Sequence, residues 1–273
     1  MSRGSAAEVG TDRFSVRSCD GTPLAVWADG AGPPLVLVHG SLSDHTTFEP
    51  LVHELRDGVS TFSMDRRGFG ASGDAAGYAI EREFEDVAAV VEAVATRTGE
   101  PVALWGHSYG AGCAMGGAAR TSDVHRLVLY EPGLGIASPA GSIEEIEAAV
   151  AAGDMEAAVV AVLVGILEMT QDDVDTLRVS PRWPVLLAAG PTVPRECRVE
   201  QGWVYRPGQF DAIAAPTLLL AGSQSPPMLK EATRRAAAAI PDPRVRPLKG
   251  HGHLAHKTDP AMVAAVIRQF ILP

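Results

Sequence analysis

Short apolar runs recur along the chain, and the first of them, residues 34–38, leads directly into His39-Gly40. A short apolar run without polar alternation is typical of a strand that is buried on both faces of a sheet. The same pattern predicts further buried strands at residues 59–64, 102–105, 125–130, 216–221 and 245–248. Ahead of them, alternating residues on both sides of Asp20-Gly21 predict an antiparallel hairpin.

Between most of these strands the apolar residues recur at helical spacing. Helices are expected over residues 78–96, 111–120, 229–240 and 260–272. Strands that alternate with helices form a mostly parallel sheet with helices on both faces. In such sheets ligands bind at the carboxyl ends of the strands, so we expect a functional site directly after one or more strands.

The alternation stops in residues 132–215, where helical patterns occur without a convincing buried strand. Ser142-Ile-Glu-Glu145 resembles a capping box that opens a helix. Further helices are expected over residues 155–169, 174–187 and 194–203. We predict that residues 132–215 form a helical cap, or lid, over the strand ends of a core made by residues 1–131 and 216–273. The alternative is that these helices simply continue the core.

Gly106-His-Ser-Tyr-Gly110 matches the pattern G-x-S-x-G of a nucleophile elbow. It follows a predicted strand and precedes a helix rich in small residues, which is the context that the pattern requires. A sharp turn from strand to helix exposes the serine hydroxyl, and the flanking glycines relieve crowding there. The N-terminus of the helix favours a developing oxyanion. Ser108 is therefore the candidate nucleophile, and the alternative is an incidental Gly/Ser turn.

A neutral serine needs a general base, and in this pattern the base is a histidine late in the chain. His251 and His253 share the loop after the strand that ends at Leu248, so position alone leaves both as candidates. A third group orients the histidine and stabilises its charged form. The commonest position for that group is the turn Gly222-Ser-Gln-Ser-Pro226, which contains no acid.

Glu131 is the candidate acid because it directly follows Tyr130 and so lies at the carboxyl edge of the sheet, near Ser108. Two other interpretations remain open. In one, Glu131 is a surface carboxylate or a salt-bridge partner of the lid. In the other, the site is a Ser-His dyad whose histidine is held by Ser225 or by a backbone carbonyl.

Two backbone N–H groups are expected to form an oxyanion hole beside the nucleophile. One belongs to Tyr109, the residue after Ser108, and the other to Ser41 in the loop after residues 34–38. His39 resembles a second catalytic base, but we interpret it as a structural histidine that bonds its own loop. Residues 65–72 are interpreted as a structural loop that packs beside the elbow.

Together these segments resemble the α/β-hydrolase superfamily over nearly the full length of the chain. The resemblance depends on His39-Gly40, Asp65-Arg-Arg-Gly-Phe-Gly-Ala-Ser72, Gly106-His-Ser-Tyr-Gly110 and Gly252-His253. It implies an eight-stranded, mostly parallel sheet flanked by helices, with a helical cap in residues 132–215. It also implies Ser108 as nucleophile and His253 as base. The chain departs from many relatives at Ser225, where they have aspartate, while some branches place the acid where this chain has Glu131.

Charge and composition limit the possible partners. The net charge is -10 and the sequence pI about 5.3, without a dense basic block, so nucleic acid is a poor candidate partner. The longest apolar run, residues 157–167, is too short for a bilayer, which needs about 20 residues. Residues 1–14 contain no signal-like stretch, and the three cysteines have no metal-ligand spacing and are expected to be small, mostly buried hydrophobes. We expect a cytoplasmic protein with no membrane partner.

A serine in the elbow favours acyl transfer to water, without a metal or an organic cofactor. Epoxide hydrolases and dehalogenases of this fold attack with a carboxylate and fit less well. The apolar stretch 157–167, with Trp183 and Trp203, indicates a small apolar ester-type substrate: a carboxylic ester, lactone or thioester. No cluster of Arg or Lys suits a phosphate or several carboxylates. The alternatives are a carbon–carbon bond hydrolase or lyase with the same Ser-His pair, and a non-catalytic ligand receptor.

Overall fold

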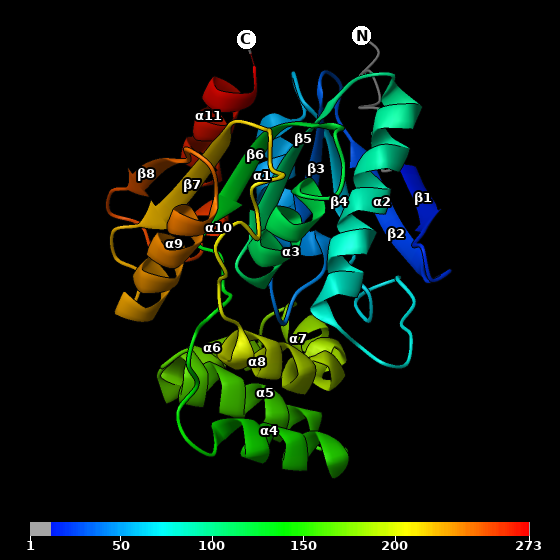
Figure 1. The fold of residues 1–273 in the computed structure, drawn as a ribbon. Coiled ribbons are helices and arrows are strands. Elements are labelled where there is room, and N and C mark those ends of the chain that lie inside the picture. The colour runs from blue at the N-terminus through cyan, green and yellow to red at the C-terminus, as the bar shows by residue number, and fades with distance from the viewer. Residues whose placement is uncertain (1–11, 273) are drawn as a thin grey trace, which may run out of the picture.

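The computed structural model describes residues 12–272, which contain one eight-stranded sheet with helices on both faces (Figure 1). The strand order is β1-β2-β4-β3-β5-β6-β7-β8. The strands are β1 (Asp12–Arg17), β2 (Pro23–Asp29), β3 (Pro34–Val38), β4 (Ser60–Met64), β5 (Val102–His107), β6 (Val124–Tyr130), β7 (Thr217–Gly222) and β8 (Arg244–Leu248). β2 pairs antiparallel with β1 and β4, and all other neighbours are parallel. The hairpin and the mostly parallel sheet are as predicted.

Two apolar clusters, one on each face, hold the helices against the sheet. One cluster includes residues of α2 (Ile80–Thr98), α3 (Tyr109–Ala118) and α9 (Pro227–Ala239). The other includes residues of the 3₁₀ helix η1 (His45–Phe48), α1 (Glu49–Leu55), α10 (Ala255–Thr258) and α11 (Pro260–Ile271). Every residue of β3 and β5 is buried because helices cover them on both sides. The carboxyl ends of these central strands are thus fixed by packing from two directions.

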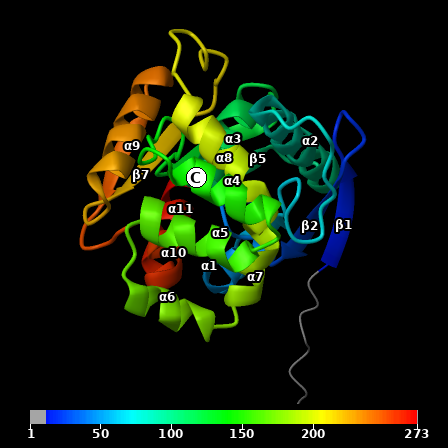
Figure 2. The ribbon, with the colours of Figure 1, turned by 90° about the horizontal axis from the view of Figure 1, so that it is seen from below.

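The insertion between β6 and β7 lies at the carboxyl ends of the strands, below the sheet in Figure 1 and facing the viewer in Figure 2. Its elements are α4 (Ser142–Ala151), α5 (Met155–Val160), the π-helix η2 (Ala161–Ile166), α6 (Gln171–Arg178), α7 (Trp183–Ala189), the 3₁₀ helix η3 (Gly190–Thr192) and α8 (Val193–Gly202). They pack around an apolar cluster of their own, which also includes Leu42 and Phe69 from loops of the sheet region.

The capping box predicted at the start of α4 does not form. Gly141, with a φ of 83°, occupies the N-cap, and Ser142 is already helical, so its hydroxyl donates instead to the carbonyl of Pro139 at 2.7 Å. The capping box that the insertion does contain joins Thr170 and Asp173 at the start of α6. The sequence pattern was thus correct for a helix start and wrong for the contact that makes it.

The apolar helix predicted over residues 155–169 is shorter and less regular than expected. The α-helix ends at Val160, and the chain continues as a π turn to Ile166, where the N–H of Leu167 donates to the carbonyl of Val162 at 2.9 Å. Single π turns are rare within helices and occur frequently at functional sites. This one lies beside the cavity described below.

Two burial predictions need correction. β8 is the last strand in the sheet order, so residues 244–247 are exposed and only Leu248 is buried, whereas a fully buried strand was expected. Arginine and proline at these positions are typical of an edge strand. Cys19 is exposed because it lies in the turn between β1 and β2, while the other two cysteines are buried. No helix within residues 12–272 is long and apolar enough to cross a membrane.

Candidate active site

Ser108 lies at the sharp turn between β5 and α3, with backbone angles of φ 57° and ψ −126° that few non-glycine residues adopt. The turn requires glycines on both sides because other backbone segments approach closely. A β carbon added at Gly106 would lie 2.5 Å from the carbonyl oxygen of Gly110, and one at Gly110 would overlap the carbonyl oxygen of His39. The chain therefore forms the elbow that its G-x-S-x-G pattern predicts.

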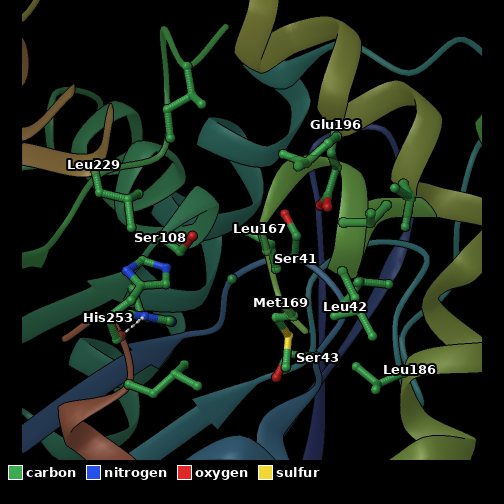
Figure 3. Close-up of a pocket in the computed structure, with 18 of the residues that line it drawn as sticks. Ser41, Leu42, Ser43, Ser108, Leu167, Met169, Leu186, Glu196, Leu229 and His253 are labelled. Atoms are coloured by element: carbon green, nitrogen blue, oxygen red, sulfur yellow. Dashed lines mark hydrogen bonds between the residues drawn. The ribbon is translucent and has the colours of Figure 1, made fainter. Parts of the chain in front are cut away.

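A hydrogen bond joins Glu131 to His253, with 2.6 Å between Oε2 of the glutamate and Nδ1 of the histidine. Glu131 follows β6 directly, is fully buried and has a φ of 47°. Its other oxygen, Oε1, accepts a 2.6 Å hydrogen bond from the N–H of Gly222 at the end of β7. Both oxygens are thus engaged, and the imidazole of His253 lies beside Ser108 (Figure 3).

The alternative residues left open by the sequence lie elsewhere. Ser225 is buried, and its Oγ has no hydrogen-bond partner among the described residues. The ring of His251 faces Asp259, with 3.7 Å between Nε2 and Oδ2. Of these candidates, Glu131 is the residue that bonds to the His253 ring.

Two further histidines lie behind His253, because His107 packs against its ring and His256 packs against His107. The ring centroid of His107 lies 4.4 Å from that of His253 and 4.4 Å from that of His256. Nε2 of His107 lies 2.8 Å from the carbonyl oxygen of His253, to which it donates. Burial holds the pKa of both His107 and His256 well below the usual value, so both rings are neutral. They support the position of His253 without adding a charge beside it.

The two predicted oxyanion donors lie on either side of Ser108. Tyr109 is the first residue of α3, and Ser41 lies in the loop after β3 and lines the same cavity as Ser108. Gly40 lets this loop approach the elbow, because a β carbon there would lie 2.8 Å from Cβ of Ser108. Within residues 12–272, no protein acceptor engages the backbone N–H of Tyr109 or Ser41. Both donors are therefore available to a ligand.

His39 and residues 65–72 form hydrogen bonds that support the loops next to the site. Nδ1 of His39 donates to the carbonyl of Gly40 at 2.8 Å, and Nε2 accepts from the N–H of Arg66 at 3.1 Å. Burial, and then the charge of Arg66, lower the pKa of His39 to about 3, so the ring is neutral with both nitrogens in use. Asp65 accepts hydrogen bonds from the same loop. These contacts agree with the structural interpretation of both segments.

Arg66 also connects the sheet region to the insertion, which the sequence did not reveal. Its guanidinium is fully buried and lies 3.0 Å from both carboxylate oxygens of Glu83 on α2. It forms a second ion pair with Glu196 on α8. A fully buried arginine requires a carboxylate partner, but only the fold shows that Arg66 is buried and which carboxylates are near.

A cavity of about 220 Å³ lies between the strand ends and the insertion, and Ser108, His253 and Ser41 are in its wall (Figure 3). Its apolar lining includes Val162, Leu163 and Ile166 of the π turn, Leu186 of α7 and Leu229 of α9. Its charged lining consists of Glu168, Arg182, Glu196, Glu200 and Lys257. A largely apolar cavity with a few polar groups is typical of a small-molecule site.

The model of the alpha/beta hydrolase family matches residues 35–266 of this chain. The chain belongs to this family. The predicted resemblance and the eight-stranded fold are thereby confirmed, and as an alpha/beta hydrolase the protein is a hydrolytic enzyme. Within residues 12–272, no three His, Cys, Asp or Glu side chains are grouped to hold a metal ion.

Three relatives illustrate the range of this similarity. The 2-(acetamidomethylene)succinate hydrolase of Mesorhizobium japonicum is 27% identical, covering 97% of this chain and 98% of its own. A solved alpha/beta hydrolase from Sphaerobacter thermophilus is 31% identical with a TM-score of 0.80, over 94% of this chain and 99% of that one. Naproxen esterase from Bacillus subtilis is 20% identical with a TM-score of 0.70, over 96% and 92%, and shows a shared fold.

Proposed function

We propose that this alpha/beta hydrolase is a serine hydrolase that cleaves small carboxylic esters, lactones or thioesters through an acyl-enzyme. Ser108 is the nucleophile, His253 the general base and Glu131 the acid of the triad. The main support is the 2.6 Å hydrogen bond between a fully buried Glu131 and His253, which lines the same cavity as Ser108. The apolar cavity lining favours a substrate with apolar groups near the scissile bond.

The hydrogen bond to Glu131 fixes the proton of His253 on Nδ1, which leaves Nε2 as the basic nitrogen. Oγ of Ser108 attacks the carbonyl carbon of the substrate while Nε2 accepts the hydroxyl proton. The positive imidazolium that results is stabilised by the buried carboxylate of Glu131. Both glutamate oxygens already have partners, so no reorientation is needed when this charge develops.

The negative charge that develops on the substrate oxygen is stabilised by the backbone N–H of Tyr109, at the N-terminus of α3, and by that of Ser41 in the loop after β3. Collapse of the tetrahedral intermediate releases the alcohol or thiol, which takes the proton from His253. A water molecule then gives its proton to His253 and attacks the acyl-enzyme. The second collapse releases the carboxylic acid and returns the proton to Ser108.

A second candidate reaction uses the same Ser108 and His253 on a substrate that is not an ester. The Mesorhizobium relative supports it, because 2-(acetamidomethylene)succinate carries an acetamido group and no ester in its name. Carbon–carbon bond hydrolysis and lyase chemistry belong to the same alternative. A parallel panel of esters, amides and β-diketones separates these reactions, because each bond yields a different product.

The decisive experiment is labelling with a fluorophosphonate, read by mass spectrometry on the wild type and on Ser108→Ala. We expect one adduct, located on Ser108, and neither adduct nor turnover in the variant, which loses at least about 10³-fold in kcat. Ser142→Ala, whose hydroxyl lies on α4 and bonds the local backbone, is the control and should label like the wild type. An unlabelled but folded wild type contradicts the proposal and favours a ligand receptor. Full turnover by Ser108→Ala also contradicts it, because the enzyme would then not use Ser108 as its nucleophile.

A further inference from the structure

Two basic side chains, one from the insertion and one from the sheet region, line the cavity. Arg182 precedes α7 of the insertion, and Lys257 lies on α10, four positions after His253 in the sequence. Both are half-buried and line the cavity that contains Ser108. They are close enough for the charge of Arg182 to lower the pKa of Lys257. The fold thus places two like charges at one wall of a small, largely apolar space.

Neither cation has a carboxylate partner in the described part of the chain. No ion pair within 4.0 Å includes Arg182 or Lys257, although many other arginines there are paired. The charge of Asp44 acts on both, but from beyond ion-pair distance. Its Oδ1 already accepts hydrogen bonds from the N–H and the hydroxyl of Thr46. Neither basic group therefore has a fixed negative partner among the described residues.

The acidic groups of the cavity do not supply the missing charge. Glu196 is held by Arg66, and Glu168 is exposed. Burial, and then the neighbouring charge of Glu196, raise the pKa of Glu200 to about 8, so at neutral pH it is mostly uncharged. The charge balance of the cavity is therefore positive at the wall that Arg182 and Lys257 form.

Half-buried cations without a counter-ion are unfavourable, and the effect is visible on both groups. Burial lowers the pKa of Arg182, and burial together with Arg182 lowers the pKa of Lys257 to about 7. A bound anion would remove this penalty for both side chains at once. Arginine presents a planar pair of donors that matches a carboxylate, and lysine adds a mobile point charge.

We propose that Arg182 and Lys257 form a subsite for a carboxylate of the substrate, so that the enzyme prefers small esters that carry a second, ionised carboxyl group. The inference rests on the proposed function for the scissile bond and adds the class of substrate. Because one cation comes from the insertion and the other from the sheet region, the bound carboxylate would contact both. The free carboxylate end would lie at the cationic wall and the ester at Ser108.

The test compares a half-ester of a short dicarboxylic acid with the matching diester, which has similar size and no charge. In the wild type we expect kcat/KM to be at least about 10-fold higher for the half-ester. Arg182→Gln and Lys257→Met should each raise KM for the half-ester by about 10- to 100-fold, the range for hydrogen bonds to charged groups. The preference for the half-ester, measured as the ratio of its kcat/KM to that of the diester, should fall by about the same factor, because the diester has no negative charge for either side chain to bind.

Arg178→Gln is the matched control. Arg178 lies on α6 of the same insertion, pairs with Glu156 and Asp175, and does not line the cavity. It removes one positive charge from the same part of the molecule, so it controls for general electrostatic attraction. We expect both esters to behave in this variant as they do in the wild type.

A binding measurement decides the matter without catalysis. Glutarate and the uncharged glutaramide are titrated by calorimetry into Ser108→Ala, with and without the added change Lys257→Met. We expect glutarate alone to bind, and the added change to weaken it about 10-fold or more. Equal binding of the two compounds, or glutarate binding that ignores Lys257, overturns the subsite. If Ser108 is labelled but esters are not discriminated by charge, the serine hydrolase stands and only the subsite falls.

Discussion

The carboxyl edge of the sheet and the insertion that covers it are built differently. At the edge, the groups that hold the elbow and His253 are partnered: both oxygens of Glu131 and both ring nitrogens of His39 are hydrogen-bonded. The insertion contributes apolar side chains to the cavity, together with Arg182, which has no ion-pair partner in the described residues. Paired groups are rigid and define one geometry, whereas unpaired ones are available to a ligand.

Positive φ angles of non-glycine residues are concentrated at the sheet edge, although Glu168 of the insertion also has a φ of 55°. Three non-glycine residues with positive φ lie at the ends of adjacent strands: Leu42 after β3, Ser108 after β5 and Glu131 after β6. Such conformations cost energy and persist where the surrounding packing enforces them. Here the fully buried strands on either side supply that packing. The comparison suggests that the sheet region fixes the chemistry and that the insertion selects the substrate.

We expect the largest loss of activity from Glu131→Gln, which tests whether the sheet region fixes the chemistry. Glutamine keeps the shape of the side chain but carries no negative charge, so it cannot stabilise the imidazolium of His253. We expect kcat to fall by about 10²- to 10⁴-fold, as for other triad acids, with little change in KM. Steady-state kinetics on an ester that the wild type hydrolyses measures the effect.

Ser225→Ala provides the matched comparison for that variant. Its Oγ has no hydrogen-bond partner in the described residues, so we expect turnover to change less than about threefold. The reverse outcome is a large loss of turnover in Ser225→Ala and a small one in Glu131→Gln. It would mean that Ser225, and not Glu131, orients the ring of His253.

The elbow was predictable because its signal is local. Gly106 and Gly110 are needed by contacts within the turn and the neighbouring loop, and they stand at fixed spacing from Ser108. Glu131 was predictable in part, since its position at a strand end places it at the correct edge. Its bond to His253 spans 122 positions along the chain, and no local pattern encodes such a distance.

The insertion was less predictable, and the reason is physical. Its helices carry apolar residues, but whether residues 161–166 continue as an α-helix or as a π turn depends on packing against neighbours. Arg182 and Lys257 are distant in sequence, so counting basic residues in windows could not bring them together. The exposure of β8 likewise depends on its place at the edge of the sheet, which composition alone did not show.

A variant of Arg66 tests how much the contact between the sheet region and the insertion contributes to stability. Arg66→Met removes a buried cation that pairs with Glu83 of the sheet region and Glu196 of the insertion. Because two buried carboxylates lose their partner, we expect a destabilisation of about 3–5 kcal/mol. At about 2–4 °C per kcal/mol for a chain of this size, the melting temperature falls by on the order of 10 °C.

The shape of the transition adds to the result. A single calorimetric transition that moves as a whole means that the sheet region and the insertion unfold together. Two transitions mean that Arg66 is a main link between separable units. Arg178→Met, which removes two ion pairs near the surface, is the control and should cost about 1 kcal/mol at most.

The smallest effect concerns Glu200, an acid of the insertion that lies near the elbow. A β carbon added at Gly133 would lie 2.9 Å from Oε1 of Glu200 and 3.1 Å from the backbone nitrogen of Tyr109, so both lie against the same glycine. Its folded-state pKa of about 8 exceeds the ordinary value of 4.5. Between pH 4.5 and pH 8, Glu200 is therefore protonated in the folded protein and ionised in the unfolded chain.

This proton makes stability depend on pH with a definite sign. The contribution of Glu200 is fully present below pH 4.5 and is lost as pH rises toward 8. Glu200→Gln has no such proton, so its melting temperature relative to the wild type should rise by several degrees between pH 5 and pH 9. Glu145→Gln, at an exposed position of α4, serves as the control for the same scan.

A difference in melting temperature between Glu200→Gln and the wild type that stays constant from pH 5 to pH 9 would mean that Glu200 is ionised. The cavity would then hold a negative charge near Ser108, and the contrast between a paired edge and a cationic wall would weaken.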